Sequence, residues 1–274
     1  MEKQKIRLIH NMARSGSTLI CKCLGCMKGV VLLSEIHPQG WEVFNPIKQA
    51  QEWFGLLSRN DIDGLLKIND LSFADVIGLI ELRARQRGGN LVVRDWSHFD
   101  FTGYPFISTP GYRPLLYDEL AESFDVIRIS VTRDPVAQWQ SLANLAVMEK
   151  ALLSGEFGVD RFLEGYRKYA ELCTETGFIR YEDFVLKPEM EMRKLCSRLQ
   201  IEFDPDFINN WPDYKTITGD IPDPANPDDI KRPRDSNEIL SLPGRPVEPD
   251  LREKFLDNAD YRRACELLGY DLLE

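Results

Sequence analysis

The sequence predicts an α/β protein in which a central parallel β-sheet is flanked by helices on both faces. Short apolar runs alternate along the chain with longer segments of helical periodicity, and this order favours parallel strands joined by helical crossovers. Four chemically distinctive side chains, Arg14, Glu35, Arg94 and Arg133, each come just after an apolar run. Because ligands bind beyond the carboxyl ends of the strands in such sheets, these residues mark a candidate site.

The elements follow from the pattern in chain order. The β-branched run 30–33 is typical of a buried strand, and residues 46–87 carry helical periodicity interrupted by Gly and Asn-Asp turns. Pro135 suits the first turn of a helix, because its missing N–H is not needed there. The expected strands are 6–12, 30–33, 91–93, 126–131 and 178–181. The expected helices are 18–24, several within 46–87, 115–123, 136–150, 159–176, 189–199 and 250–268.

Residues 212–250 form a long segment rich in Pro, Asp and Asn. A helical segment follows it, so we interpret it as a loop within a single domain spanning residues 1–274 rather than as a linker. Long ordered loops of this kind are often functional lids.

The composition is that of an ordinary globular protein with an acidic balance. The 274 residues include 34 Lys and Arg against 44 Asp and Glu, a formal net charge of −10, whereas a protein that coats nucleic acid has a basic excess. No nucleic-acid partner is therefore expected. The chain shows no secretory signal and no run near the ~20 apolar residues that cross a bilayer. We therefore expect a cytoplasmic protein with no membrane partner.

The six cysteines do not indicate a disulfide framework in a chain of this length. Cys21, Cys23 and Cys26 lie close together in sequence, but no paired C-x-x-C or His partner completes a set of four ligands. We therefore expect small buried thiols and no metal site.

The turn Arg14-Ser15-Gly16-Ser17-Thr18 joins the first strand to the first helix. Backbone N–H groups at a helix N-terminus bind anions, Gly allows close backbone approach, and Arg adds a permanently charged fork. The Walker A pattern needs a Lys where Ser17 stands and a Gly that opens the loop, so a Mg-nucleotide triphosphatase is disfavoured. The alternative is a Ser/Gly turn that only caps a helix.

A second segment runs from Arg133, at the end of a strand, to Ser141 on the second turn of the next helix. An Arg and a hydroxyl placed in this way can hold one phosphate from two sides. The alternative is a surface Arg133 paired with Asp134.

Together the two segments resemble the sulfotransferases that use 3′-phosphoadenosine 5′-phosphosulfate (PAPS). Residues 14–18 match that family's R-S-G-[ST]-T loop for the 5′-phosphosulfate, and residues 133–141 match its R-D-P/G-x-A-x-x-x-S segment for the 3′-phosphate. Residues 180–189 look like its R-Y-E-D/Q-L-V…P-E segment, which implies that Tyr181 lies near the adenosine. The R-S-G-S-T turn is most similar to the carbohydrate and tyrosyl-protein branches. The resemblance implies a P-loop-type three-layer fold.

The resemblance also suggests a general base for the reaction. In those branches a Glu after the second strand takes the proton of the acceptor, and Glu35 stands at that position. His37 is the alternative base, although a hydrogen-bonded structural histidine beside Pro38 is the favoured interpretation of that residue.

Arg94 follows the third strand, where the tyrosyl-protein branch has a Lys that contacts the transferring sulfuryl group. The resemblance implies the same role for Arg94, and an ion pair with Asp95 or another neighbour is the alternative. Trp96, His98, Trp41 and Phe44 are candidates to line the acceptor pocket, or simply pack in the core.

The family closes a basic C-terminal loop over the 3′-phosphate, and Lys231, Arg232 and Arg234 lie in the loop expected here. The resemblance therefore implies a loop that PAP, the product of PAPS, orders. The implied catalytic residues are Arg14, Glu35, Arg94 and His37. The implied PAPS-binding residues are Arg14, Ser15, Gly16, Ser17, Thr18, Leu19, Arg133, Ser141, Tyr181, Lys231, Arg232 and Arg234.

The expected activity is transfer of the sulfuryl group from PAPS, without a metal, to a hydroxyl, with an amine as the second candidate acceptor. The acceptor is expected to be a small molecule or a carbohydrate. Two alternatives stay open: a P-loop small-molecule kinase, and a protein that binds PAP or another nucleotide without chemistry. A kinase should carry a loop Lys and a Mg-binding carboxylate after a strand.

Overall fold

The computed structural model of the chain describes residues 3–219, 238–240 and 245–274. Five parallel strands among these residues form one sheet in the order β2-β3-β1-β4-β5. Their bounds are β1 Lys5–Asn11, β2 Val30–Ile36, β3 Asn90–Asp95, β4 Asp125–Thr132 and β5 Phe178–Arg180. The all-parallel sheet between helical layers confirms the predicted fold class.

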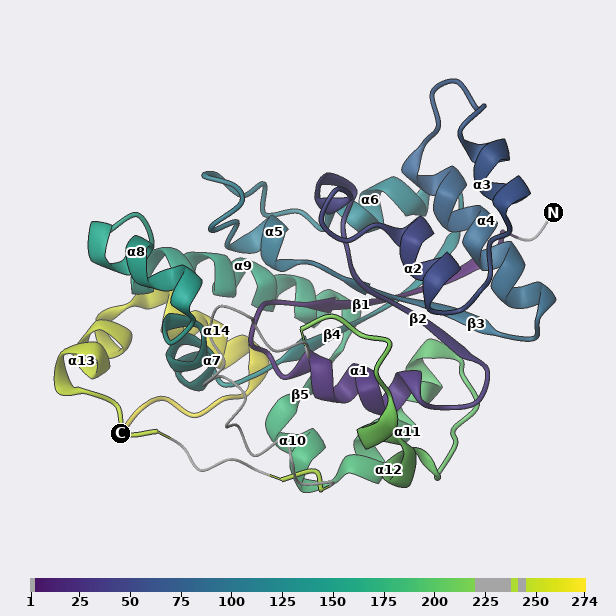
Figure 1. Ribbon diagram of the computed structural model, residues 1–274. Helices are drawn as coiled ribbons and strands as arrows, with labels where there is room; N and C mark the ends of the chain where they lie inside the picture. The colour runs from purple at the N-terminus through teal and green to yellow at the C-terminus, as the bar shows by residue number, and fades with distance from the viewer. Residues whose placement is uncertain (1–2, 220–237, 241–244) are drawn as a thin grey trace.

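Helices cover both faces of this sheet (Figure 1). One face carries α1 (Ser17–Gly25), α10 (Tyr181–Leu186), α11 (Pro188–Leu199) and α12 (Phe207–Asn210). The other carries α2 (Pro46–Glu52), α4 (Phe73–Gln86), α6 (Leu115–Ala121) and α9 (Val159–Thr176). The remaining elements are α3 (Arg59–Leu65), α5 (His98–Phe101), α7 (Pro135–Ala143), α8 (Ala146–Ser154), α13 (Pro249–Asp257), α14 (Ala259–Leu268) and the 3₁₀ turns η1 (Pro38–Gly40) and η2 (Trp211–Asp213).

The two sides of the core follow from the alternation of side chains along each strand. Ile9 and Ile129 pack with α1 and α11 on one face, whereas Leu8 and Val93 pack with α2 and α4 on the other. Because both faces are covered, β2 and β3 contain apolar runs (30–33 and 91–93), whereas β1 and β4 also carry buried polar side chains such as Arg7, His10 and Ser130. No helix of the described residues combines the length and apolar character that a bilayer crossing requires.

The carboxyl ends of the strands lie level with one another. Ile9 pairs with Arg94, Asn11 with Val131, and Thr132 with Arg180. This register brings the residues that follow β1, β3, β4 and β5 to one edge of the sheet.

Two segments predicted as single helices are each two helices. The segment 136–150 breaks between α7 and α8 because Leu145 is extended (φ −78°, ψ 134°) and the Asn144 side-chain amide donates to the carbonyl of Gln140 in the last turn of α7. The segment 250–268 breaks at Asn258, whose Oδ1 accepts from the N–H groups of Asp260 and Tyr261 and so starts α14. In both cases an Asn side chain satisfies backbone groups that would otherwise continue the helix.

Candidate active site

The turn between β1 and α1 has the backbone form expected of an anion-binding turn. Gly16 is the N-cap of α1 with φ 82°, and Arg14 also has a positive φ of 66°. Leu19 donates its N–H back to the Gly16 carbonyl (3.1 Å). The N–H groups at the first two positions of α1, those of Ser17 and Thr18, have no acceptor in regular helix geometry and point toward a ligand at this turn.

Tyr181 explains why position 16 requires glycine. A Cβ atom at residue 16 would lie 2.2 Å from Tyr181 Cδ2, so the aromatic ring rests directly on the turn backbone. The ring also lies 5.0 Å from the guanidinium carbon of Arg133. The three segments recognised in the sequence therefore meet around one tyrosine ring.

Arg14 connects the turn to α7. Its Nε donates to Ser141 Oγ (2.9 Å), and Arg133 Nη1 donates to the Arg14 carbonyl (3.2 Å). Asp134, the alternative partner of Arg133, instead caps α7 by accepting from the Ala137 N–H (2.7 Å). The turn and the Arg133–Ser141 segment are thus directly hydrogen-bonded.

Arg94 lies buried beneath this turn, with all three guanidinium nitrogens hydrogen-bonded to protein oxygens. Nη2 donates to Ser17 Oγ (3.1 Å) and Thr18 Oγ1 (3.2 Å), and it lies 3.5 Å from Glu35 Oε1. Because both hydroxyl oxygens accept from Arg94, each keeps its own hydrogen to donate to a ligand. The alternative pair with Asp95 is not formed, since Asp95 Oδ2 binds His10 Nδ1 (2.6 Å).

Glu35 sits in an irregular part of β2 rather than after a finished strand. Leu33 pairs with Val93 and Ile36 with Asp95, so Ser34 and Glu35 together oppose Arg94 alone. This is a β-bulge, which re-aims side chains next to many active sites. Glu35 has φ 56°, and its carboxylate reaches Arg94 beside the turn.

His37 is fully buried and hydrogen-bonded at both ring nitrogens. Nδ1 accepts from the Gln39 N–H (3.1 Å), so Nε2 carries the proton that is shared with Asp100 Oδ1 (3.1 Å). Its ring stacks on Phe99. Burial raises the pKa of Asp100 to about 6, although the hydrogen bond from His37 opposes that rise. His37 thus has the geometry of the structural alternative.

Ser34, Thr218 and Asn11 complete the surroundings of Arg94, and none of them was predicted as a site residue, although Thr218 lies just before the expected basic loop. Ser34 Oγ accepts from Arg94 Nη1 (3.1 Å) and from the Thr218 N–H (3.2 Å), and so its own hydrogen points to Thr218 Oγ1 (2.8 Å). The Thr218 carbonyl accepts from Arg94 Nη1 (3.2 Å), and Asn11 Oδ1 accepts from Arg94 Nε (3.3 Å). Only the position of Asn11, at the end of a strand, could have drawn attention to it.

Three buried polar atoms around the turn have no hydrogen-bond partner within the described parts of the chain: Ser15 Oγ, Arg133 Nε and Gln138 Oε1, whose own amide nitrogen donates to the Ala13 carbonyl. An unsatisfied buried donor is costly unless a ligand completes it. Ser15 Oγ and Arg133 Nε can donate to an anion, which fits a phosphate or sulfate ester at this turn, whereas Gln138 Oε1 can only accept.

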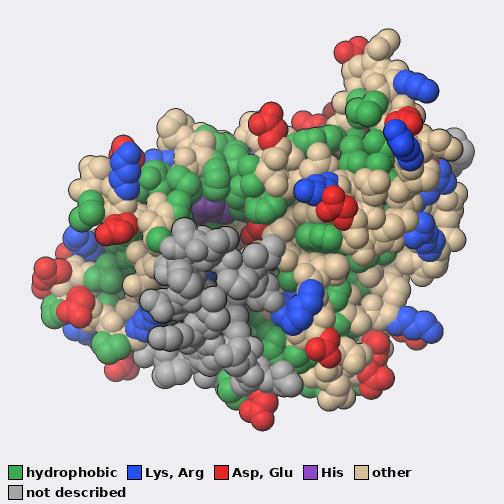
Figure 2. Space-filling model, viewed as in Figure 1, with side chains coloured by type: hydrophobic (Ala, Val, Ile, Leu, Met, Phe, Trp, Pro, Cys, Tyr) green, Lys and Arg blue, Asp and Glu red, His purple; other side chains and the backbone are tan. Residues whose placement is uncertain are grey.

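Of the four candidates for an acceptor wall, Trp96 and Phe44 belong to one aromatic cluster, whereas Trp41 and His98 have other partners. Trp96 contacts Phe44, Phe99 and Phe106 with ring centroids 4.7–4.9 Å apart, and Trp41 packs separately on Phe73. Hydrophobic side chains gather over the region of α5 on the face shown in Figure 2. His98 is buried with Nε2 bonded to the Tyr104 carbonyl (2.6 Å), and burial lowers its pKa to about 4.

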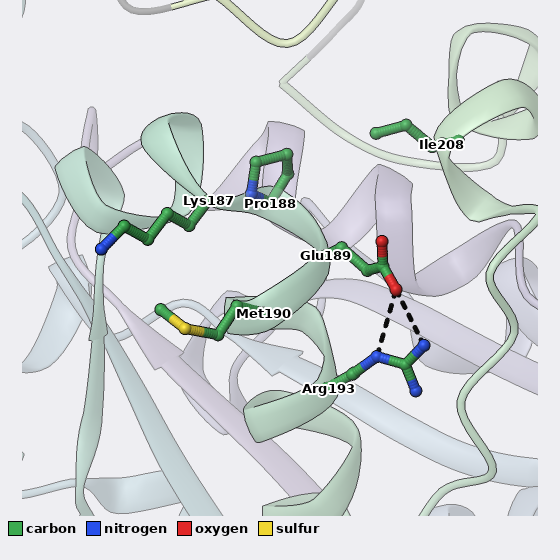
Figure 3. Close-up of a pocket in the computed structure, with 6 residues that line it drawn as sticks. All are labelled: Lys187, Pro188, Glu189, Met190, Arg193 and Ile208. Atoms are coloured by element: carbon green, nitrogen blue, oxygen red, sulfur yellow. Dashed lines mark hydrogen bonds and ion pairs between the residues drawn. The ribbon is translucent and has the colours of Figure 1, made fainter.

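Lys231, Arg232 and Arg234, the expected basic loop residues, lie outside the described residues. Within the described ranges, no group of three or more His, Cys, Asp and Glu side chains is placed to hold a metal ion. A separate surface pocket lies at the start of α11 (Figure 3), and none of the residues predicted for the site lines it. Its lining residues are Lys187, Pro188, Glu189, Met190, Arg193 and Ile208.

Comparison with known proteins shows which solved structures share this fold. No family model and no curated protein sequence matches the chain. Among solved structures, the sulfotransferase domain from the curacin biosynthetic pathway matches with a TM-score of 0.66 and 18% identity, covering 100% of both chains. The sulfotransferase domain of the Synechococcus PCC 7002 olefin synthase matches with a TM-score of 0.64 and 19% identity, covering 99% of this chain and 97% of that chain. The chain therefore has the fold of these sulfotransferase domains along its whole length.

Proposed function

We propose that this protein is a sulfotransferase that moves the sulfuryl group of PAPS to a hydroxyl of a small-molecule or carbohydrate acceptor. The observation that carries the proposal is the convergence of Arg14, Arg133, Ser141 and Tyr181 on one turn. The sequence assigned these residues to opposite ends of one doubly phosphorylated nucleotide. Their direct contacts fit a single ligand of that kind.

Two groups of residues bind the two anionic ends of PAPS. Of the backbone N–H groups of residues 15–19, those of Ser15 and Leu19 already donate to carbonyls of the chain. Those of Gly16, Ser17 and Thr18, with the Ser17 and Thr18 hydroxyls, bind the 5′-phosphosulfate at the N-terminus of α1. Arg133 and Ser141 bind the 3′-phosphate, and the Tyr181 ring packs on the adenosine side of the turn. PAPS, when bound, supplies the sulfuryl group and a phosphate leaving group.

The chain's own residues then supply charge and a proton acceptor. Glu35 takes the proton of the attacking hydroxyl, and a positioned general base contributes about 10²–10⁴-fold in rate. Arg94 holds Ser17, Thr18 and Glu35 in register and places its positive charge under the atoms where negative charge develops. His37 has a structural role and does not take the proton, because both of its ring nitrogens are hydrogen-bonded to Asp100 and Gln39.

The two structural neighbours support this proposal at the level of fold. A kinase is less consistent with the site, because Ser17 stands where a P-loop Lys would stand.

Ligand-induced stabilisation tests the proposal directly. We expect PAP to raise the melting temperature of the purified chain, and ATP with Mg²⁺ to have a much smaller effect. We also expect ³⁵S-labelled PAPS to be converted to labelled product when a cell extract is supplied as the source of acceptors. Stabilisation by ATP and Mg²⁺ alone would favour the kinase. Tight PAP binding without any sulfuryl transfer would favour a non-catalytic nucleotide-binding protein.

A further inference from the structure

We propose that Gln49 is a positioning residue for Glu35. The inference rests on the proposed function and deepens it, because it concerns how the carboxylate that acts as base is held. Gln49 lies on α2, outside every motif recognised in the sequence.

Gln49 makes a two-point hydrogen bond to the backbone of Ser34, the residue before Glu35. Its Oε1 accepts from the Ser34 N–H (2.7 Å), and its Nε2 donates to the Ser34 carbonyl (2.8 Å). The two backbone partners fix the orientation of the amide, since one is a donor and the other an acceptor. The Gln49 side chain is buried, so water does not compete for these bonds.

The position of β2 explains why this contact is needed. β2 is an edge strand of the sheet, so the backbone groups of Ser34 that face away from β3 have no neighbouring strand. The Gln49 amide takes the place of that strand for a single residue. The β-bulge at Ser34 and Glu35 shows that this contact does more than stabilise the strand edge.

In a regular strand, Ser34 and Glu35 would point to opposite faces of the sheet. Here both side chains reach Arg94, with Ser34 Oγ at 3.1 Å and Glu35 Oε1 at 3.5 Å. The bulge and the positive φ of Glu35 make this possible. Residues other than glycine keep such a backbone conformation only where their surroundings hold it.

The Gln49 contact is next to that strained residue, and its two hydrogen bonds go to Ser34 rather than to the Arg133–Ser141 segment. Loss of both hydrogen bonds leaves the Ser34 peptide groups unsatisfied and lets the Ser34–Glu35 segment relax toward an extended form. The Glu35 carboxylate then turns away from Arg94, while the Arg133–Ser141 segment, which the proposed function assigns to the 3′-phosphate, keeps its contacts with Arg14. The expected consequence is slower chemistry with unchanged nucleotide affinity.

The test uses cleavage of ³⁵S-labelled PAPS by water, so that the natural acceptor is not required. One S–O bond forms to water, the S–O bond to the 5′-phosphate breaks, and a proton of the water passes to Glu35. Gln49→Met should slow this cleavage by about 10-fold or more, part of what a general base contributes, with the Kd for PAP changed less than about twofold. Gln51→Met, an exposed residue of the same helix, is the matched control and should behave as wild type.

Two further variants separate positioning from a general structural role. In a Glu35→Gln background, Gln49→Met should cause no additional loss of cleavage, because its effect acts through Glu35. Gln49→Glu should recover activity relative to wild type as the pH is lowered from about 8 to about 5, because a protonated carboxyl offers the same donor and acceptor as the amide.

The outcomes are distinguishable. Wild-type cleavage by Gln49→Met, additional loss in the Glu35→Gln background, or a ratio of Gln49→Glu to wild-type activity that ignores pH would each overturn the positioning role. A wild-type chain that neither binds PAP nor cleaves PAPS would overturn the proposed function itself.

Discussion

Arg14 and Ser141, 127 positions apart in the sequence, are joined by a hydrogen bond from Arg14 Nε to Ser141 Oγ of 2.9 Å. One residue belongs to the turn that begins α1 and the other to the second turn of α7. The guanidinium is therefore held in place by the segment that the sequence assigned to the opposite end of the nucleotide. This arrangement preorganises the positive charge of the site before any ligand binds.

Removal of the Arg14 guanidinium should lower the rate of sulfuryl transfer. We expect Arg14→Ala to lower the rate of sulfuryl transfer by about 10²–10³-fold, which corresponds to about 2.7–4 kcal/mol of transition-state stabilisation, as for loss of one oxyanion donor.

Ser141→Ala removes one neutral hydrogen bond and should weaken PAP binding by about 0.5–1.5 kcal/mol. Steady-state kinetics and calorimetric titration measure the two effects. Ser123→Ala, at an exposed position, is the control; equal effects from all three variants would contradict the assignment.

Glu35→Gln tests the base with little change in shape. The neutral amide cannot accept the acceptor's proton, so transfer should fall by about 10²-fold or more, while PAP titration should give an affinity close to that of wild type. Glu35 contacts Arg94 rather than the Arg133–Ser141 segment, which is why the two readouts should separate. A parallel loss of PAP affinity would mean that Glu35 is structural.

Gly16→Ala should destabilise the protein through two separate effects. The new Cβ would meet the Tyr181 ring at 2.2 Å, and the positive φ of residue 16 disfavours any L-residue, a conformational strain of about 1–3 kcal/mol. Tyr181→Ala should relieve the first effect but not the second, so the double variant should be more stable than additivity predicts. Urea unfolding measures each free energy.

Gly64→Ala provides the matched control for that substitution. Gly64 lies in α3, and no atom lies within 4 Å of the place that an alanine methyl group would take there, so alanine should stabilise the helix by about 0.5–1 kcal/mol. Destabilisation by both glycine substitutions would show that the effect at Gly16 is not specific to the turn.

His98 should make the folded state sensitive to acid. Burial lowers its pKa to about 4, below the unfolded value of about 6.5, so the unfolded chain binds the proton more tightly. The free energy of unfolding should therefore fall as the pH drops through this window, by about 1.4 kcal/mol per pH unit from this group. Asp100, with a pKa raised to about 6, contributes with the opposite sign.

The difference in slope between wild type and His98→Gln isolates the histidine contribution. Urea unfolding between about pH 4.5 and 6.5 should give a shallower pH dependence for the variant. Identical slopes would show that His98 does not titrate in this way.

Local sequence patterns predicted many of the strands and helices, because apolar periodicity depends on which side of an element is buried. The strand predicted at 126–131 lies within β4, and the helix predicted at 159–176 coincides with α9. Patterns failed where one polar side chain interrupts an otherwise helical segment, as Asn258 does between α13 and α14. The apolar run 30–33 likewise gave no indication that β2 continues through a bulge to Ile36.

The sequence by itself determined the α/β class and pointed to Arg14, Glu35, Arg94, Arg133 and Tyr181, since each lies near a strand end, and to Ser141 through its spacing from Arg133. The tertiary structure decided how these residues meet: Tyr181 on Gly16, Arg94 beneath the turn, and Ser34 held by Gln49 and Thr218. Such contacts depend on which strands are neighbours and on their register, and no local pattern encodes either.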